Sequence, residues 1–538
     1  MKRLYTLVLA LALAACGRGP ASGDFDPLAL AQASAGHVGN PDAVVPPQCY
    51  TRTDGVANPC WTCHTARNGR NLTDDVRLQE RYAFKHGGMR NRWDNLFQDR
   101  RTAIAGIDDA QMLTYLRQDN YSALRDSLRA RRDYPGWRPD LDFSRGFDAE
   151  GFARDGSWWR AFRYKPFPGT FWPTNGSTDD IAIRLPRFFY SDAQGRPSRE
   201  IYKINLAILE AALAVPDTVP DAQLRRRIEP VDESVAGMDL DGDGRIAGTV
   251  TLIRGLPLHY AGGAAGVGVT RHLYPINTEF LHTVRYLDPD APDLASRRMK
   301  EVRYAIKTRF LAGDDLAEEY REEAAEDRSD RPPVFAGTPV TGVTSPFGWR
   351  LQGFIEDAQG RLRLQTQEEH QFCMGCHTGL GITVDQSFGF PRKRPGVDGW
   401  GTQSLAGMPD APQAGQREPE TLVYFRRARG GDEFRANDEV LGRYFPAGAL
   451  DEAKVRAAQD LRELITPSRE RALLLDKASL ALVRQQDFAH GRDALPQPAV
   501  NVHRLIQNGD TGLKKNHAVY DDGRLWLDWP EAAGATPP

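Results

Sequence analysis

The chain has 538 residues, with 69 lysines and arginines against 72 aspartates and glutamates, and a formal net charge of -3. This balance excludes the strongly cationic surface with which proteins bind nucleic acids, so we expect no nucleic-acid partner. The hydrophobic fraction of 41% and the charged fraction of 26% are those of a folded globular protein, with room for about three or four domains. Six cysteines are too few for a disulfide scaffold in a chain of this length, so their positions are more informative than their number.

Residues 1–16 have the layout of an export signal. A short basic start precedes an apolar run, residues 4–15, which is too short to span a bilayer as a stable helix. The run ends in Leu-Ala-Ala-Cys16, which resembles the lipobox of bacterial lipoproteins, where the cysteine is acylated and becomes the first residue of the mature chain. A plain signal peptide cleaved near the same place is the alternative. Gly17 stands where this family often carries an aspartate for inner-membrane retention, so the resemblance implies an outer-membrane lipoprotein that faces the periplasm or the cell surface.

The rest of the chain has mostly helical patterns. A tether rich in glycine, alanine and proline comes first. Apolar residues at helical spacing predict helices within residues 109–132, 201–214, 296–325 and 450–490, whereas residues 245–290 have the pattern of strands and turns. The expected segments are the signal peptide 1–16, the tether 17–45, a first motif module 46–135, a middle α+β segment 136–332, a second motif module 333–415, and a C-terminal helical region and tail 416–538.

An acidic loop in the middle segment matches the first half of an EF-hand calcium loop. Asp239, Asp241 and Asp243 occupy the positions of alternating carboxylate ligands, and the carbonyl of Arg245 would supply a further oxygen. The last ligand position holds Val250 in place of a glutamate, so another acid, such as Glu233, has to complete the site. The loop therefore predicts a structural calcium ion, with a solvated turn as the alternative.

Two copies of the pattern C-x-x-C-H carry the strongest chemical signal in the chain. The residues concerned are Cys60, Cys63 and His64 in the first copy and Cys373, Cys376 and His377 in the second. Two thiols at this spacing can each add to one vinyl group of a haem, and the histidine that follows is then placed under the iron. A zinc ribbon needs two such cysteine pairs at short separation, and neither a thioredoxin-like site nor a disulfide explains a histidine that follows twice. We expect two covalent haems c, with Cys49 left as a buried free thiol.

Together with the export signal, the two motifs resemble those of the di-haem c-type cytochromes of Gram-negative cell envelopes. The resemblance implies a mainly α fold with large irregular content, in which cytochrome c-like haem modules flank a middle segment with a small antiparallel β element. It also implies electron transfer between redox partner proteins of the envelope, with the membrane reached through the lipid anchor. The alternative is a di-haem redox enzyme of the peroxidase or oxygenase type, with one haem as active site. Electron transfer is favoured because the sequence has no recognisable catalytic constellation, and because di-haem peroxidases carry their two motifs much closer together.

The second axial ligand of each iron would decide between these functions, because an open position permits substrate chemistry. For the first haem the sequence points to His86, which lies in a glycine-rich stretch shortly after the motif. For the second it points to Met408, in a loop that resembles the methionine loop of small cytochromes c. The histidines of the middle segment, His259, His272 and His282, are further candidates for either iron.

Overall fold

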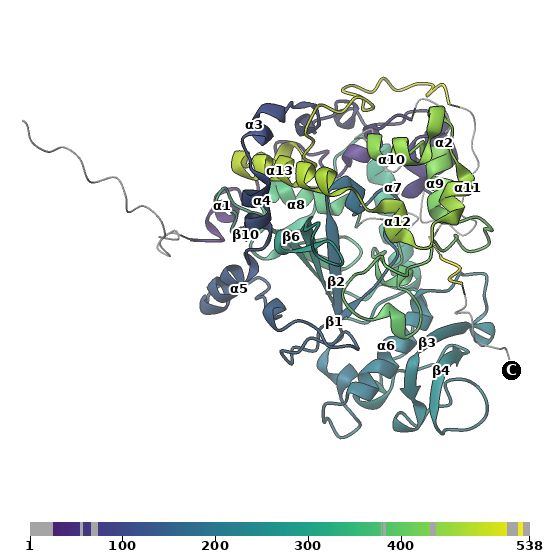
Figure 1. Cartoon of the computed structure of the whole chain (residues 1–538). Helices are drawn as coiled ribbons and strands as arrows, with labels where there is room; N and C mark the ends of the chain where they lie inside the picture. The colour runs from purple at the N-terminus through teal and green to yellow at the C-terminus, as the bar shows by residue number, and fades with distance from the viewer. Residues whose placement is uncertain are drawn as a thin grey trace, which may run out of the picture.

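A large antiparallel sheet runs through the middle of the molecule (Figure 1). The computed structural model describes residues 25–53, 57–65, 74–377, 379, 383–430, 437–513, 524 and 526–530. Within this part of the chain the strands follow the order β1-β2-β5-β6-β9-β8-β7, and β10 pairs with β9. Their bounds are β1 Arg160–Phe162, β2 Thr178–Arg184, β5 Glu279–Leu287, β6 Ala295–Lys307, β7 Ala336–Thr338, β8 Gly342–Thr344, β9 Trp349–Glu356 and β10 Leu362–Leu364.

Four strands of this sheet bring one row of residues to the same face. Ile181 of β2 is paired with His282 of β5, His282 with Arg303 of β6, and Arg303 with Gly353 of β9. Residues that are directly opposed in an antiparallel sheet point to the same side, and all four line one cavity. Leu281, the neighbour of His282, points to the other side and is buried in a separate apolar cluster. The register of the sheet therefore decides which side chains reach the cavity.

Helices cover both the edges and one end of the sheet (Figure 1). Helix α13 packs on α3, α4 and β5, which brings the C-terminal part of the chain against residues 101–116 (Figure 1). Helices α9 to α12 form a group beside it. The bounds are α1 Ala29–Ala33, α2 Asp75–Glu80, α3 Arg101–Ala105, α4 Asp109–Leu116, α5 Tyr121–Ala130, α6 Arg199–Leu213, α7 Gly313–Arg328, α8 Gln367–Met374, α9 Glu420–Ala428, α10 Asp438–Tyr444, α11 Glu452–Ala457, α12 Leu461–Ile465 and α13 Arg469–Gln485.

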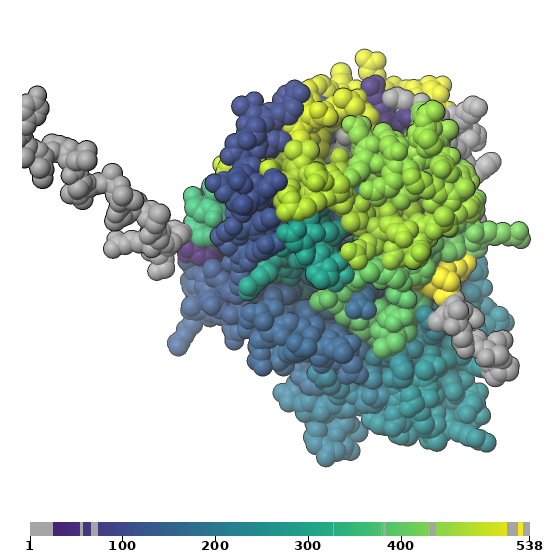
Figure 2. Space-filling model, viewed as in Figure 1, coloured from purple at the N-terminus to yellow at the C-terminus, as the bar shows by residue number. Residues whose placement is uncertain are grey.

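A smaller lobe holds α6 and a second, two-stranded sheet (lower part of Figures 1 and 2). Its strands are β3 Arg225–Asp232 and β4 Thr249–Arg254, and β3 packs on α6. Helix α6 begins where the Ser198 hydroxyl accepts a hydrogen bond from the backbone N–H of Ile201 (3.3 Å), as expected of an N-cap residue. Almost every residue of α6 is buried, so this helix is the core of the lobe.

The prediction of a mainly α fold made of cytochrome c-like modules is wrong. Strands drawn from residues 160–364 form one large sheet, and the expected β element is split, because β4 belongs to the small sheet and β5 to the large one. The helix expected within 296–325 forms only as α7, and β6 replaces its first part. The charges of β6 resemble a solvated helix face in the sequence, but they form buried ion pairs, such as Arg298 with Glu356 and Lys307 with Asp385.

The described helices include none that combines the length and the apolar character needed to cross a bilayer.

Candidate functional site

Both C-x-x-C-H motifs border the same cavity, although they are far apart in the sequence. Cys63 of the first motif and Cys373, Cys376 and His377 of the second line its wall. The empty space inside the cavity, its open mouth included, amounts to about 2280 Å³. Its wall is formed by side chains of the large sheet, of α8 and of α13, together with residues of both motifs.

The second motif begins on α8 and continues into the turn after it. The helix starts with a capping box, in which the Thr366 hydroxyl accepts from the Glu369 N–H (3.2 Å) and the Glu369 carboxylate accepts from the Thr366 N–H (2.7 Å). Cys373 lies in the last turn of the helix, and Cys376 and His377 follow directly after it. The capped helix therefore fixes where the motif enters the cavity wall.

The ring of His377 is held by one hydrogen bond and is neutral. Its Nδ1 donates a hydrogen bond to the carbonyl oxygen of Gln386 (2.8 Å), which leaves Nε2 with its lone pair. Burial lowers the pKa of His377 to about 4, so the ring is neutral at neutral pH. A neutral imidazole whose other nitrogen is held by a carbonyl or carboxylate is the usual state of a histidine that binds a metal. The ring of Phe388 stacks on it, with 6.0 Å between the ring centroids.

The first motif lies on a short 3-10 helix, Pro59–Thr62, held in place by α2. Gln79 of α2 accepts from the backbone N–H of Asn58 (2.9 Å) and donates to its carbonyl oxygen (2.7 Å). Trp61 is buried at the centre of an apolar cluster, against which the side chain of Cys63 packs. Burial raises the pKa of the Cys60 thiol to about 12, so this thiol is protonated at neutral pH.

The five described cysteines are free thiols, so neither motif forms a disulfide. They also do not form a ready zinc site. In the described part of the chain, no three cysteine or histidine ligand atoms lie within 4.8 Å of one another, whereas an acidic group discussed below meets this condition. A preformed tetrahedral zinc site would require such convergence.

Cys49 lies where the two motifs adjoin. Burial raises the pKa of its thiol well above the usual value, and the neighbouring thiols Cys60, Cys63 and Cys376 raise it further. Both motifs are therefore within electrostatic reach of the Cys49 thiol. Cys49 itself is half-buried against the apolar cluster that contains Tyr50 and Trp93.

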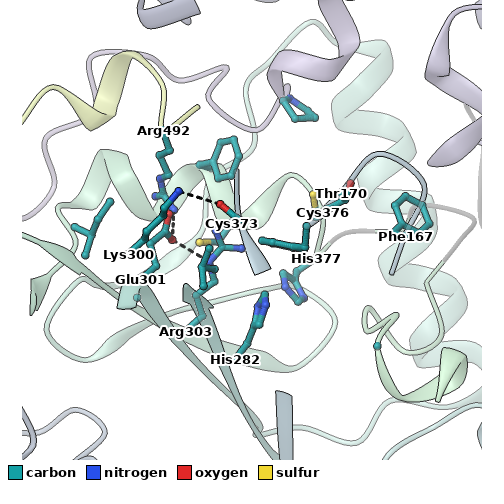
Figure 3. A pocket seen from close by; sticks show the side chains of 18 of the residues that line it. Phe167, Thr170, His282, Lys300, Glu301, Arg303, Cys373, Cys376, His377 and Arg492 are labelled. Carbon is teal, nitrogen blue, oxygen red and sulfur yellow. Dashed lines mark hydrogen bonds and ion pairs between the residues drawn. The ribbon is translucent and has the colours of Figure 1, made fainter. Parts of the chain in front are cut away.

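Charged side chains cross the cavity wall beside the second motif (Figure 3). Arg303 donates to the Glu301 carboxylate (2.9 Å), and Arg492 donates to the same oxygen (2.7 Å). Burial would raise the pKa of Glu301, but the two guanidinium groups outweigh burial and lower it to about 2. Lys300 adds a third cation, which donates to the Gly176 carbonyl (2.6 Å). This wall can neutralise the carboxylates of an anionic ligand.

The structure separates the histidines and the methionine that the sequence singled out as axial ligands. Met408 is fully buried in the apolar cluster around Trp61, beside the first motif, whereas the sequence interpretation paired it with the second. His86 is exposed, and its backbone N–H donates to Asp330 (2.8 Å). The ring of His272 is held in the small lobe, where its Nε2 donates a hydrogen bond to the Val215 carbonyl (2.8 Å). Of these candidates, only His282 lines the cavity.

The residues of the cavity wall outside the two motifs have no recognisable pattern in the sequence. Arg303, Arg492, Phe171 and Phe388 belong to no motif and come from distant segments. Only the row of paired strand residues brings Arg303 next to His282, and no single-sequence pattern shows strand pairing across such distances.

The acidic loop converges as the sequence predicts, and Glu233 joins it. Ligand oxygens of Glu233, Asp239, Asp241 and Asp243 lie within 4.8 Å of one another. Glu233 also accepts hydrogen bonds from the backbone N–H groups of Leu240 (2.8 Å) and Ala247 (3.1 Å), so it closes the loop on itself. The loop connects β3 to β4 in the small lobe, and the calcium ion stays a prediction.

Comparisons with known proteins place the chain in a lipoprotein family. A family model described as "-like lipoprotein" matches residues 33–460. The chain is also 32% identical over 517 residues to an "Uncharacterized lipoprotein" of Aquifex aeolicus (strain VF5), and the match covers 84% of this chain and 86% of that protein. No solved structure matches.

The protein therefore belongs to this lipoprotein family, and it is a protein associated with the cell envelope. Cys16, the predicted site of lipidation, lies outside the described residues.

The expected membership of the di-haem c-type cytochromes is wrong, because the family that matches is a lipoprotein family and the fold is built on a large antiparallel sheet. The prediction of haem attachment does not depend on that membership, since it rests on the ten motif residues alone.

Proposed function

We propose that this lipoprotein carries two covalently attached haems c, one at each C-x-x-C-H motif, and transfers electrons in the cell envelope. The observation that carries the proposal is that residues of both motifs line one and the same cavity. When bound, haem supplies an iron centre that exchanges single electrons.

The residues of the second site fit such a group. Cys373 and Cys376 offer two free thiols for the thioether bonds, and His377 offers a neutral imidazole whose Nδ1 is already fixed by the Gln386 carbonyl. Arg303 and Arg492 provide guanidinium groups in the same wall for the propionate carboxylates of the porphyrin. Aromatic rings, such as Phe388, supply the apolar contact that the flat macrocycle needs.

The arrangement of the two sites supports a relay. Cys63 and Cys376 border one cavity and both lie near Cys49, so the two haems would be neighbours. The two motifs would hold the haems close enough together for single electrons from a redox partner protein of the envelope to be exchanged between them. We further propose that the acylated Cys16 anchors the protein to the outer membrane, so that the relay operates at the membrane surface.

A redox enzyme with one haem as active site is the second candidate. The extent of the cavity favours it, because the wall continues beyond the second motif to Leu475, Leu482 and Val483 of α13. Such space could admit a substrate if the iron kept an open position.

The haem content of the protein tests the proposal. The full chain, produced in a bacterium that attaches haem c during export, should show two haem masses per chain and the pyridine haemochrome spectrum of haem c. The double variants Cys60→Ala/Cys63→Ala and Cys373→Ala/Cys376→Ala should each retain one haem. Cys49→Ser is the matched control and should retain two. A wild-type chain without covalent haem would overturn the proposal.

A further inference from the structure

The side chain of His282 lies in the cavity beside the second motif. It comes from the middle of β5, and its ring lies close to the ring of His377 in Figure 3. The two imidazoles are also within direct electrostatic reach of each other. Two histidines that approach one another from different elements, β5 and the turn after α8, are arranged to share a ligand between them.

Hydrogen bonds hold the ring of His282 in one orientation. Its Nε2 lies 3.0 Å from the Asp179 carboxylate, and the hydroxyl of Tyr164 donates to the same carboxylate oxygen (2.6 Å). Asp179 and Tyr164 are both buried. The ring of Phe171 stands edge-on to the imidazole, with centroids 4.9 Å apart. The position of His282 is therefore set by β2, β5 and the aromatic residues of the cavity wall.

This hydrogen bonding also determines the state of the two ring nitrogens. A carboxylate only accepts hydrogen bonds, so Nε2 of His282 carries the hydrogen in its contact with Asp179. Nδ1 keeps its lone pair and has no hydrogen-bond partner among the described residues. Histidines that bind metals nearly always donate their other N–H to a carboxylate or a carbonyl group. His377, bound to the Gln386 carbonyl, and His282, bound to Asp179, both have this arrangement.

The other histidine of the cavity wall is used differently. His370 lies on α8, and both of its ring nitrogens have backbone partners. Nε2 accepts from the Gly353 N–H (3.0 Å), and Nδ1 donates to the Thr366 carbonyl (2.9 Å). His370 therefore has a structural role, and it leaves His282 as the imidazole of the wall that has a nitrogen to offer opposite His377.

We propose that His282 is the second axial ligand of the iron held by Cys373, Cys376 and His377, with Asp179 as the residue that positions it. This inference rests on the proposed function, because it requires haem at the second motif. It deepens that function, since an iron with two histidine ligands has no open position. The second site would then transfer electrons and would not bind a substrate at the iron.

Spectroscopy of the full chain tests this assignment. In the oxidised wild-type protein, both haems should be low-spin and should not bind cyanide readily at low concentration. In His282→Ala, one of the two haems should become high-spin and should bind cyanide, and added imidazole should restore the low-spin spectrum. The control His259→Ala replaces an exposed histidine of the small lobe and should leave the spectrum unchanged.

Two further measurements keep the outcomes separate. Asp179→Asn keeps the size of the positioning side chain but removes its charge, so it should weaken the ligand and make that haem partly high-spin. If His282→Ala does not fold, the wild-type spectrum still decides, because a high-spin haem in the wild type overturns the assignment. Two attached haems that both stay low-spin in His282→Ala overturn the ligand assignment alone, whereas absence of covalent haem overturns the proposed function itself.

Discussion

Cys63 and Cys376 belong to motifs that are far apart in the sequence, yet both line one cavity and both lie near the thiol of Cys49. The number of thiols that react in the denatured chain shows whether both motifs carry haem. If both motifs bind haem and Cys16 is acylated, the denatured mature chain should react with one equivalent of thiol reagent, at Cys49. If neither motif is modified, five thiols should react, because all five described cysteines are free. Native protein should react slowly, since the raised pKa of Cys49 leaves little thiolate at neutral pH.

Cys16→Ser should release the protein from the membrane fraction. A single acyl chain binds a bilayer only weakly, but a bacterial lipoprotein carries several chains, so the wild type should stay in the membrane fraction. Fractionation followed by immunoblotting measures the difference, with Cys49→Ser as a control for the same substitution elsewhere. Equal membrane retention of wild type and Cys16→Ser would show that the lipid is not the anchor.

Chelation of calcium should destabilise the wild type and leave Asp241→Ala almost unaffected. Asp241 is one of the four converging acids, so its loss should remove a ligand of the predicted ion. An ion that binds only the folded state stabilises it by about 2.7 kcal/mol when its concentration is one hundred times the Kd. Thermal unfolding with and without chelator measures this, and Asp221→Ala, an exposed acid of the same lobe, is the control. A wild type that does not respond to chelator would identify the loop as a solvated turn.

Glu210→Ala should lower the free energy of unfolding by about 3–5 kcal/mol, because it removes the carboxylate that neutralises two buried cations. Glu210 of α6 is almost fully buried and accepts from Lys393 (2.8 Å) and Arg226 (2.8 Å). Glu318→Ala removes the carboxylate of an exposed pair with Arg321 and should change stability by no more than about 1 kcal/mol. Urea unfolding of the two variants gives both values, and similar losses in both would contradict the dominant role of the buried pair.

Asp476→Asn should flatten the pH dependence of stability between about pH 4 and pH 8. Burial raises the pKa of Asp476 to about 8, so the folded chain retains a proton that the unfolded chain releases above its ordinary pKa near 4. The folded state binds more protons in this range, and stability therefore falls as pH rises, by at most about 1.4 kcal/mol per pH unit. Melting temperatures at pH 5 and pH 8 should differ less in the variant than in the wild type. An unchanged difference would mean that Asp476 is ionised in the folded protein.

Local patterns in the sequence were sufficient to identify the two motifs and the acidic loop, because the residues of each lie within a few positions of one another. Glu233 could be named in advance for the same reason, since it lies only six residues before Asp239. The fold was predicted wrongly where long-range pairing decides the structure. Strand β6 has charges that look like a solvated helix face, and only its pairing with β5 and β9 turns them into buried ion pairs. The sequence did not distinguish His282 from His259 and His272 as a candidate ligand. The pairing of the strands brings His282 into the cavity wall that also contains His377.

Ile181, His282, Arg303 and Gly353 form one row across the sheet, and alternate residues of each strand face opposite sides. The strand register therefore determines which side chains line the cavity. Deletion of one residue at the start of β5 would move Thr283 to the position of His282 and His282 to the position of Leu281, which faces the opposite apolar cluster. The chain could keep its sheet and both C-x-x-C-H motifs, and would still lose the histidine from the site. Relatives in this lipoprotein family that tolerate insertions should therefore carry them in the loops between these strands and not within the strands.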